Sequence, residues 1–233
     1  MDRSKPNVVV PPTMIYTSVN EMYQSTIRLH ERIRLQRQDE PICLVGPARG
    51  VFGPARFFSD LFLVKPIVVL DTDGLYTGVG ERKNELKIYE IPKKLERIAN
   101  ASKGWILYLD DVSDSGRTSR ELFKMVRNAV SNDIVTCTLD YKTGSIFKPD
   151  YFDKEVASST WIVYGTFELR ETMDYLIAKK DFEKLALLRS LVREKEGSDE
   201  SFRSILRLYP SLPAPITSES KSDTVGVLVP GPA

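Results

Sequence analysis

The chain has 233 residues, 42% of them hydrophobic, and its 33 Lys and Arg nearly balance 32 Asp and Glu, for a net charge of +1. A chain of this length buries a substantial core, and its balanced charge gives no reason to expect a nucleic acid or an anionic membrane as partner. We therefore expect a small-molecule partner. Cys43 and Cys137 lie singly in apolar runs, which predicts buried thiols in a reducing compartment and offers no zinc-binding pattern.

The sequence also contains no recognisable targeting or membrane segment. Residues 1–12 carry charge and prolines without the apolar core of a signal peptide, and no stretch reaches the length of a membrane-spanning helix. We therefore expect a cytoplasmic protein without a membrane partner.

The first part of the chain alternates between helical and strand-like patterns. Ser18–Glu21 matches a capping box at the start of an amphipathic helix that runs to about Arg37. A buried strand over residues 41–45 leads through a Gly-containing turn into a second helix that ends near Phe62, and a strand over 67–70 follows.

The alternation continues after a less regular stretch. Residues 71–85 are rich in Gly, Thr and charge and predict a mobile excursion, and residues 86–91 predict a short strand. A strand over 105–109, a helix over 119–130 and a strand over 134–141 follow. This order predicts an α/β fold, in which a mostly parallel, twisted sheet carries helices on both faces. Ligands of such sheets bind beyond the carboxyl ends of the strands.

The composition changes after residue 166. Residues 167–208 are rich in helix formers and predict a C-terminal helical extension, with helices near 169–178, 182–196 and 200–208. Residues 209–233 form a tail rich in Pro, Ser and Thr. We therefore divide the chain into an α/β domain over 1–166, the extension and the tail. Within the tail, Val225–Val229 is either part of a disordered end or an extended segment that pairs with a sheet edge or a neighbouring subunit.

The most informative segment is Ile106–Thr118, with the sequence ILYLDDVSDSGRT. Four largely apolar residues predict a buried strand, and the carboxylates Asp110 and Asp111 stand where it ends. A turn leading into a helix follows, and it consists of Ser115, Gly116, Arg117 and Thr118. Backbone N–H groups of such a turn bind a phosphate, and the two carboxylates accept hydrogen bonds from vicinal hydroxyls, directly or through Mg2+. Phosphate, diol and divalent metal together describe a ribose 5-phosphate.

This pattern resembles the motif with which type I phosphoribosyltransferases bind 5-phosphoribosyl 1-pyrophosphate (PRPP): four apolar residues, two acidic residues and a loop that ends in Gly-x-Thr. The resemblance implies that Asp110 and Asp111 hold the ribose hydroxyls and the metal, and that the turn from Ser115 to Thr118 binds the phosphate. Arg117 stands where many members carry Gly or Lys. Its side chain either assists the phosphate or points to solvent, while its backbone N–H binds in both cases.

Asp114 corresponds to a carboxylate that, in members acting on 6-oxopurines, faces N7 of the base and is a proposed proton donor or acceptor. Proton transfer by a placed acid or base suits this position. The alternative is that Asp114 caps the following helix, and the two roles are compatible.

A second segment, Pro47–Val51, has the sequence PARGV. It resembles the pyrophosphate loop of the same family. The resemblance implies that Ala48 and Gly50 offer backbone N–H groups and that Arg49 offers its guanidinium to the two phosphates that leave. The alternative is an ordinary glycine turn with Arg49 as a surface charge.

Lys142 and the pair Trp161 and Ile162 resemble the purine-binding region of xanthine–guanine and archaeal hypoxanthine-type phosphoribosyltransferases. The resemblance implies that Trp161 stacks on the base, that the backbone of Ile162 reads its edge, and that Lys142 approaches O6. A lysine offers only donors, so it favours a 6-carbonyl over the amino group of adenine. The alternative for Trp161 is a plain core position. Glu168 follows where relatives also carry an acidic residue, with no role assigned.

The resemblance covers about residues 40–165 and implies an enzyme of purine salvage. It would transfer the 5-phosphoribosyl group of PRPP to hypoxanthine, guanine or xanthine with Mg2+ as cofactor, releasing pyrophosphate, while residues 71–85 close over the reacting centre. We also expect a homodimer, although the sequence fixes neither the oligomer nor the preferred base.

Two alternatives to this function stay open. One is a PRPP- or nucleotide-sensing regulator of the same fold without catalysis, against which the sequence shows no helix-turn-helix and no strongly basic face. The other is a phosphoribosyltransferase for another base, against which Lys142 and Trp161 speak.

Overall fold

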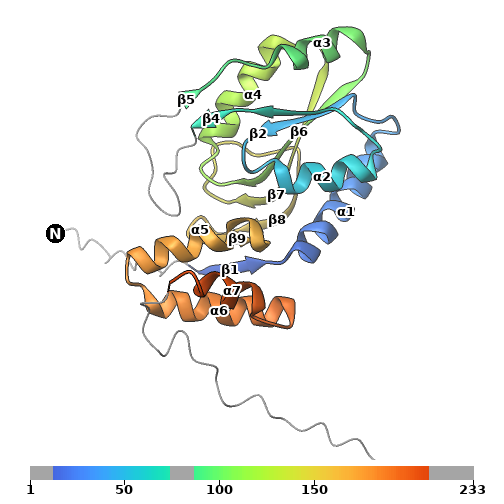
Figure 1. The fold of residues 1–233 in the computed structure, drawn as a ribbon. Coiled ribbons are helices and arrows are strands. Elements are labelled where there is room, and N and C mark those ends of the chain that lie inside the picture. Colours follow the sequence, from blue (N-terminus) through green and yellow to red (C-terminus); the bar gives the residue numbers. More distant parts are fainter. Residues whose placement is uncertain (1–12, 74–86, 210–233) are drawn as a thin grey trace, which may run out of the picture.

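The structure, a computed structural model, describes residues 13–73 and 87–209 (Figure 1). Most of the excursion predicted over residues 71–85 therefore lies outside the described residues. The same holds for the tail predicted over 209–233, of which only Tyr209 is described, so the alternatives for Val225–Val229 are not tested. The elements in chain order are β1 (Met14–Thr17), α1 (Val19–Gln36), β2 (Cys43–Pro47), α2 (Phe52–Leu61), β3 (Ile67–Leu70), β4 (Thr72–Asp73), β5 (Lys87–Ile88), α3 (Lys93–Ala101), β6 (Trp105–Ser113), α4 (Arg117–Ala129), β7 (Asp133–Lys142), β8 (Tyr151–Val156), β9 (Trp161–Tyr164), α5 (Gly165–Ala178), α6 (Phe182–Glu196) and α7 (Glu200–Leu206).

A five-stranded sheet with the order β3-β2-β6-β7-β8 forms the centre of the fold, and all of its neighbouring strands are parallel. β1 and β9 form a separate parallel pair, and β4 and β5 form an antiparallel pair. The structure confirms the predicted α/β class, with a parallel sheet between two layers of helices. The loops that follow β2, β6 and β7 emerge at one end of this sheet.

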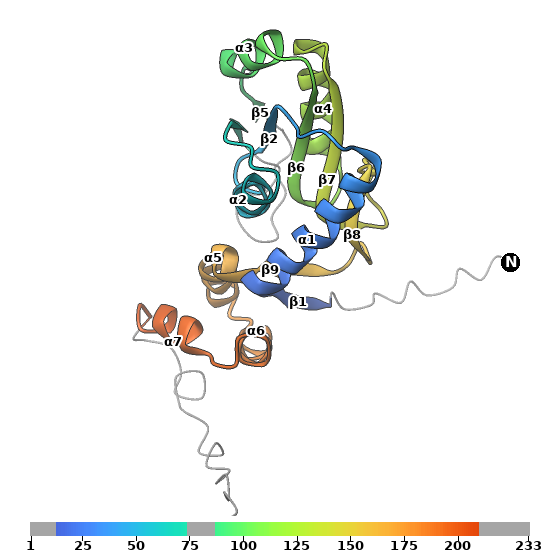
Figure 2. The ribbon, with the colours of Figure 1, turned by 90° about the vertical axis from the view of Figure 1, so that its right-hand side faces the viewer.

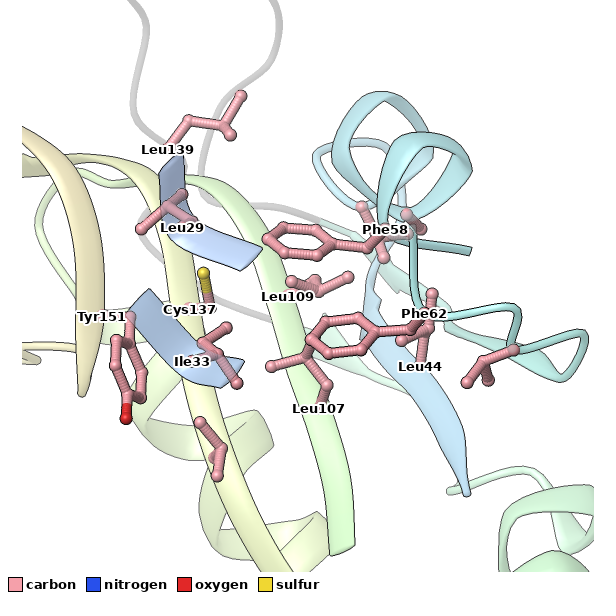
Figure 3. Packing of buried hydrophobic residues seen from close by; sticks show 14 of the residues in the cluster. Leu29, Ile33, Leu44, Phe58, Phe62, Leu107, Leu109, Cys137, Leu139 and Tyr151 are labelled. Atoms are coloured by element: carbon pink, nitrogen blue, oxygen red, sulfur yellow. The ribbon is translucent and has the colours of Figure 1, made fainter. Parts of the chain in front are cut away.

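The side chains of β6 show why the sheet is covered on both faces. Leu107 and Leu109 pack with α1 and α2, whereas Ile106 and Tyr108 pack with α3 and α4. In Figure 3 Phe58 of α2 and Phe62, which directly follows that helix, lie beside Leu109 and Leu107. A strand buried on both faces needs a continuous apolar run, which is what this segment of the sequence provides.

The predicted capping box at the start of α1 is confirmed. The Ser18 hydroxyl accepts a hydrogen bond from the backbone N–H of Glu21, and the Glu21 carboxylate accepts one from the N–H of Ser18 at 2.9 Å. The apolar face that follows is buried through Met22, Leu29 and Ile33 against the sheet. The helix ends at Gln36, one residue before the predicted end.

The C-terminal helices form a second core. Apolar residues of α5, α6 and α7 pack with residues of β1 and β9, separately from the two clusters on the main sheet. Both views place β1 and β9 between the sheet and α6 (Figures 1 and 2). The three predicted helices are present, but α5 begins at Gly165, directly after β9. None of the helices in the described ranges has the length and apolar content that a membrane span requires.

Several elements differ from the prediction. β6 was expected to end at Leu109 but continues to Ser113, because its polar end still pairs with β7 as far as the Ser113–Tyr141 position. α4 begins at Arg117 instead of Ser119. The strands β1, β8 and β9 gave no distinct signal in the sequence, since they are short and stabilised mainly by partners distant in the chain. The helix α3 was also not predicted, although Leu95, Ile98 and Ala99 recur at helical spacing and two of them are buried.

Candidate active site

Asp110 and Asp111 lie near the end of β6, inside the strand. The Asp110 side chain is buried and accepts a hydrogen bond from the Ser119 hydroxyl of α4 at 3.1 Å. The Asp111 N–H donates to the Asp110 carboxylate at 3.1 Å, and the Val112 N–H donates to the Asp111 carboxylate at 2.6 Å. Both side chains are thereby fixed at the end of the sheet where ligands of parallel sheets bind.

The two carboxylates are electrostatically strained. Burial raises the pKa of Asp110 well above its usual range, and the neighbouring Asp111 charge raises it further. Burial likewise raises the pKa of Asp111 to about 6. A bound cation would relieve this repulsion, because it favours the charged forms of both groups.

The turn after β2 lies directly against these carboxylates. A Cβ atom added to Gly50 would lie 2.1 Å from an Asp110 carboxylate oxygen and 2.8 Å from one of Asp111. Gly50 therefore brings the backbone of the turn as close to the two side chains as a chain can come. A Cβ on Gly46, the last residue but one of β2, would lie 1.9 Å from the Leu109 carbonyl oxygen, so the strand that leads into the turn also needs a glycine.

One backbone N–H group of this turn is hydrogen-bonded within the fold, and two others are available to a ligand. The Ala48 N–H, expected to bind phosphate, donates to the Leu70 carbonyl at 2.9 Å and so anchors the turn to β3. Within the described chain, the N–H groups of Arg49 and Gly50 have no acceptor. The Arg49 guanidinium pairs with Glu171 of α5, with Nη1 to Oε2 at 2.6 Å and Nη2 to Oε1 at 3.2 Å.

The turn between β6 and α4 has the form expected of a phosphate loop. Gly116 is the N-cap residue of α4 and has φ +73°, a conformation that favours glycine. The N–H groups of Ser115 and Gly116 have no acceptor in the described ranges, and the first N–H groups of α4 point out of the helix. Arg117 is exposed, and Thr118 is half-buried. Because the N-cap of α4 is Gly116, the capping alternative for Asp114 is wrong.

The loop after β7 supports this turn from one side. The Ser113 hydroxyl donates to the Phe147 carbonyl at 2.6 Å, and the Ile146 N–H donates to the Ser115 carbonyl at 3.1 Å. A Cβ on Gly116 would lie 2.4 Å from the Ser145 hydroxyl oxygen. The two loops are therefore packed without spare room.

Asp114 and Lys142, predicted to contact the purine, lie side by side. The Lys142 ammonium is 2.9 Å from an Asp114 carboxylate oxygen, and both side chains are largely shielded, at 12% and 24% exposure. Asp114 follows β6 and Lys142 ends β7, so parallel pairing of these strands brings them together. The pair offers a donor and an acceptor at the same end of the sheet as the Asp110–Asp111 carboxylates.

Trp161 lies on the opposite side of β9 from Ile162 and Tyr164, the two residues of this strand that pack toward the main sheet. Trp161 and Val163 belong to the cluster with the C-terminal helices, and the Trp161 ring meets that of Tyr175 edge to face at 5.7 Å. Ile162 and Tyr164 belong to the cluster on the main sheet. Alternation along a strand explains the division. The described structure thus brings Trp161 into contact with α5 and leaves its predicted stacking on a base untested.

Tyr164 is a residue that the sequence analysis missed. Its hydroxyl donates to the Asp140 carboxylate at 2.6 Å and lies 3.2 Å from the Asp111 carbonyl oxygen. Asp140 is buried, and its pKa is raised by that burial although the Tyr164 hydrogen bond acts in the opposite direction. Tyr164 thereby joins β9 to the ends of β6 and β7. Only its tertiary contacts reveal this role, because an aromatic residue in a short apolar run looks like ordinary core.

Two glutamates of α5 face the same region. Glu168 accepts a hydrogen bond from the Tyr164 N–H at 3.1 Å, and its pKa is raised to about 8 by burial and by the charge of Asp111. Glu171, one turn further along the helix, holds Arg49. The sequence analysis noted Glu168 without a role and did not single out Glu171. A glutamate on a predicted helix is usually solvated, so no signal in the sequence distinguished Glu171 from an ordinary surface residue.

The donor set is compatible with Mg2+ held jointly by protein and substrate. Among the described residues, no three Asp, Glu, His or Cys side chains are arranged as a complete metal site. Mg2+ usually binds proteins through one or two carboxylates together with substrate phosphates and water. Asp110 and Asp111, whose pKa values are both raised mainly by burial, fit this partial role.

Comparison with known proteins supports the fold. No family model matches the sequence, and no curated protein is detectably similar to it. Among solved structures, the chain is similar to a purine phosphoribosyltransferase from Pyrococcus horikoshii, with 24% identity, a TM-score of 0.50 and coverage of 65% of this chain and 91% of that one. It is also similar to the Helicobacter pylori xanthine-guanine-hypoxanthine phosphoribosyltransferase, with 21% identity, a TM-score of 0.55 and coverage of 71% and 99%.

A third similar structure is that of a hypothetical protein from Neisseria gonorrhoeae with bound ppGpp, with 22% identity, a TM-score of 0.54 and coverage of 66% and 89%. These likenesses show that the chain has the type I phosphoribosyltransferase fold. At such identities they show the fold alone, and the activity follows from the site.

Proposed function

We propose that this protein is a phosphoribosyltransferase that transfers the 5-phosphoribosyl group of PRPP to a 6-oxopurine. The observation that carries the proposal is the meeting of three parts at one end of the sheet. These are the turn at Gly50, the carboxylates Asp110 and Asp111, and the ion pair of Lys142 with Asp114. The fold shared with two purine phosphoribosyltransferases supports the choice of acceptor.

Each region of the site corresponds to one chemical group of PRPP. The turn at Ser115 and Gly116, with the N-terminus of α4, would bind the 5-phosphate through backbone N–H groups. Asp110 and Asp111 would accept hydrogen bonds from the two ribose hydroxyls. The N–H of Gly50 and the side chain of Arg49 would bind the pyrophosphoryl group. Mg2+, when bound, would neutralise charge on that group.

The ion pair would face the base. Lys142 donates to O6, and Asp114 accepts from an N–H of the purine, a combination that fits hypoxanthine, guanine and xanthine but not the 6-amino group of adenine. In the reaction the bond from the anomeric carbon to the pyrophosphate oxygen breaks, with the electron pair leaving on pyrophosphate, and a bond to the purine nitrogen forms. Asp114 takes the proton that the base loses, and Arg49 stabilises the leaving group.

The test is a panel experiment. The protein would be incubated with Mg2+, PRPP and each of guanine, hypoxanthine, xanthine, adenine, orotate and uracil, and pyrophosphate release would be measured. We expect release with one or more of the 6-oxopurines and none with adenine. Release only with a pyrimidine or adenine would overturn the assignment of Lys142. Omitting Mg2+ tests the proposed cofactor, while a homodimer and a cytoplasmic location stay predictions.

A second candidate is a regulator that binds PRPP or a nucleotide without catalysis. The observation that favours it is the similarity to the Neisseria gonorrhoeae protein, which is described as hypothetical and has bound ppGpp. The same panel separates the two functions. PRPP binding by calorimetry without pyrophosphate release from any base would identify the regulator.

A further inference from the structure

The ion pair between Arg49 and Glu171 joins two parts of the molecule that the proposed function treats separately. Arg49 lies in the turn after β2, and Glu171 lies on α5, which follows the base-side strand β9. The contact is bidentate, through Nη1 at 2.6 Å and Nη2 at 3.2 Å. Glu171 is 29% exposed, whereas Arg49 is 74% exposed.

The geometry leaves Arg49 able to bind a second anion. A guanidinium has five N–H donors in one plane, and Glu171 engages one on each terminal nitrogen. The Nε–H and the other terminal N–H groups have no acceptor within residues 13–73 and 87–209. The edge formed by Nε and one terminal nitrogen matches a phosphate in the same bidentate manner. Glu171 and a phosphate can therefore be held by one guanidinium at the same time.

An exposed arginine loses side-chain freedom when it binds a ligand, and that loss weakens binding. Glu171 has already fixed the Arg49 guanidinium in this structure. Its own position is set by α5, which is anchored by the bonds that Tyr164 and Glu168 make at its first turn. The guanidinium is thus ordered before any ligand arrives.

We propose that Glu171 is a positioning residue for pyrophosphate, which fixes the Arg49 guanidinium so that its Nε edge receives the pyrophosphoryl group of PRPP. The proposal rests on the proposed function and adds a residue to that site. It also means that α5, the helix on the base side, sets the geometry of the pyrophosphate side.

The first test is Glu171→Gln, which keeps the size of the side chain and removes its charge. We expect the KM for PRPP and the Kd for magnesium pyrophosphate each to rise about threefold to tenfold, as expected when one side chain must be ordered on binding. The KM for the purine should stay unchanged. Asp174→Asn is the matched control, because Asp174 lies on the same helix and forms an exposed ion pair with Arg170.

The second test asks whether Glu171 acts through Arg49. In an Arg49→Ala background, Glu171→Gln should have no further effect on pyrophosphate binding, whereas independent contributions would add. Circular dichroism and thermal unfolding of each variant would verify that the fold is retained. An equal effect of Glu171→Gln in both backgrounds would overturn the proposal.

Other outcomes are also decisive. Tighter pyrophosphate binding by Glu171→Gln would mean that Glu171 competes with the ligand, and unchanged binding would mean that the pair is only a surface contact. Either result overturns the positioning role. If the wild-type protein binds magnesium pyrophosphate but turns over no base, the proposed activity fails while the binding measurements still decide the role of Glu171. If it does not bind pyrophosphate, both proposals fall.

Discussion

The proposed phosphate side and the proposed base side of this site are built in different ways. On the phosphate side, Asp110, Asp111 and Gly116 lie within seven residues of one another, in a strand, a turn and a helix that follow directly in the chain. On the base side, Lys142 ends β7, and Tyr164 arrives from β9, a strand outside the main sheet. The geometry of a contiguous segment is set by local structure. The geometry of a site assembled from distant elements depends on how those elements pack.

The two sides also differ in their electrostatics. On the base side the Asp114 charge is matched by Lys142 at 2.9 Å. At the proposed ribose position burial raises the pKa values of both Asp110 and Asp111, and the Asp111 charge raises that of Asp110 further. The Lys142–Asp114 ion pair is complementary to a neutral base. The two carboxylates, which have no cationic side chain paired with them among the described residues, are complementary to a cation or to hydroxyl donors. The variants below test this division, from the largest expected effect to the smallest.

The largest effect is expected from Asp110→Asn combined with Asp111→Asn. The double variant should lower pyrophosphate release by on the order of a thousandfold, because the groups proposed to hold the diol and the metal lose their charge. The fold should be retained, since burial already disfavours the charged forms. Asp60→Asn, an exposed position on α2, is the control. Unchanged product formation in the double variant would contradict the site assignment.

A substitution at Gly116 tests how tightly the phosphate side is packed. In Gly116→Ala the new Cβ would lie 2.4 Å from the Ser145 hydroxyl oxygen, so we expect the loops to separate and the KM for PRPP to rise at least about tenfold, the loss of one good charge-assisted hydrogen bond. Gly197→Ala is a matched control, since Gly197 has the same φ of +73° but no atom within 4 Å of the added Cβ. If both variants lose equal stability and neither changes the KM for PRPP, the steric argument is wrong.

Trp161→Ala tests the base side. Because the ring packs against Tyr175, we expect the free energy of unfolding to fall by about 2 kcal/mol, less than for a fully buried tryptophan. If Trp161 also stacks on the base, as predicted, the KM for the purine should rise far more than the KM for PRPP. Lys142→Gln provides the comparison, with a rise of about tenfold for the purine alone. Equal effects of Trp161→Ala on both substrates would remove Trp161 from the base site.

The last prediction concerns the pH dependence of stability and not the activity. Glu168 has a folded-state pKa of about 8, against about 4.3 in an unfolded chain. Between these values the folded protein holds a proton that the unfolded chain has released, so the free energy of unfolding falls as pH rises through this range. Thermal unfolding from pH 5 to pH 8 should show this decline, and Glu168→Gln should make it shallower. An identical pH dependence in the variant would mean that Glu168 is ionised throughout.

The α/β class, the helix α1 with its capping box, and the position of the carboxylates could all be predicted from the sequence. Each rests on residues close in the chain, such as Ser18 and Glu21, or on an apolar run that only a buried strand satisfies. The prediction that β6 ends at Leu109 failed because the pairing with β7 continues beyond the apolar residues. Strand boundaries depend on the neighbouring strand, which a local pattern does not contain.

The sequence by itself determined that a glycine turn and a helix start follow two carboxylates, because these are local features with local geometry. Tertiary structure alone decided that Tyr164 reaches Asp140, that Trp161 packs on α5, and that Arg49 pairs with Glu171 across 122 positions of the chain. The physical reason is that side-chain alternation in β9 and the packing of α5 set these contacts. Both are fixed only when β9 pairs with β1 and the second core forms.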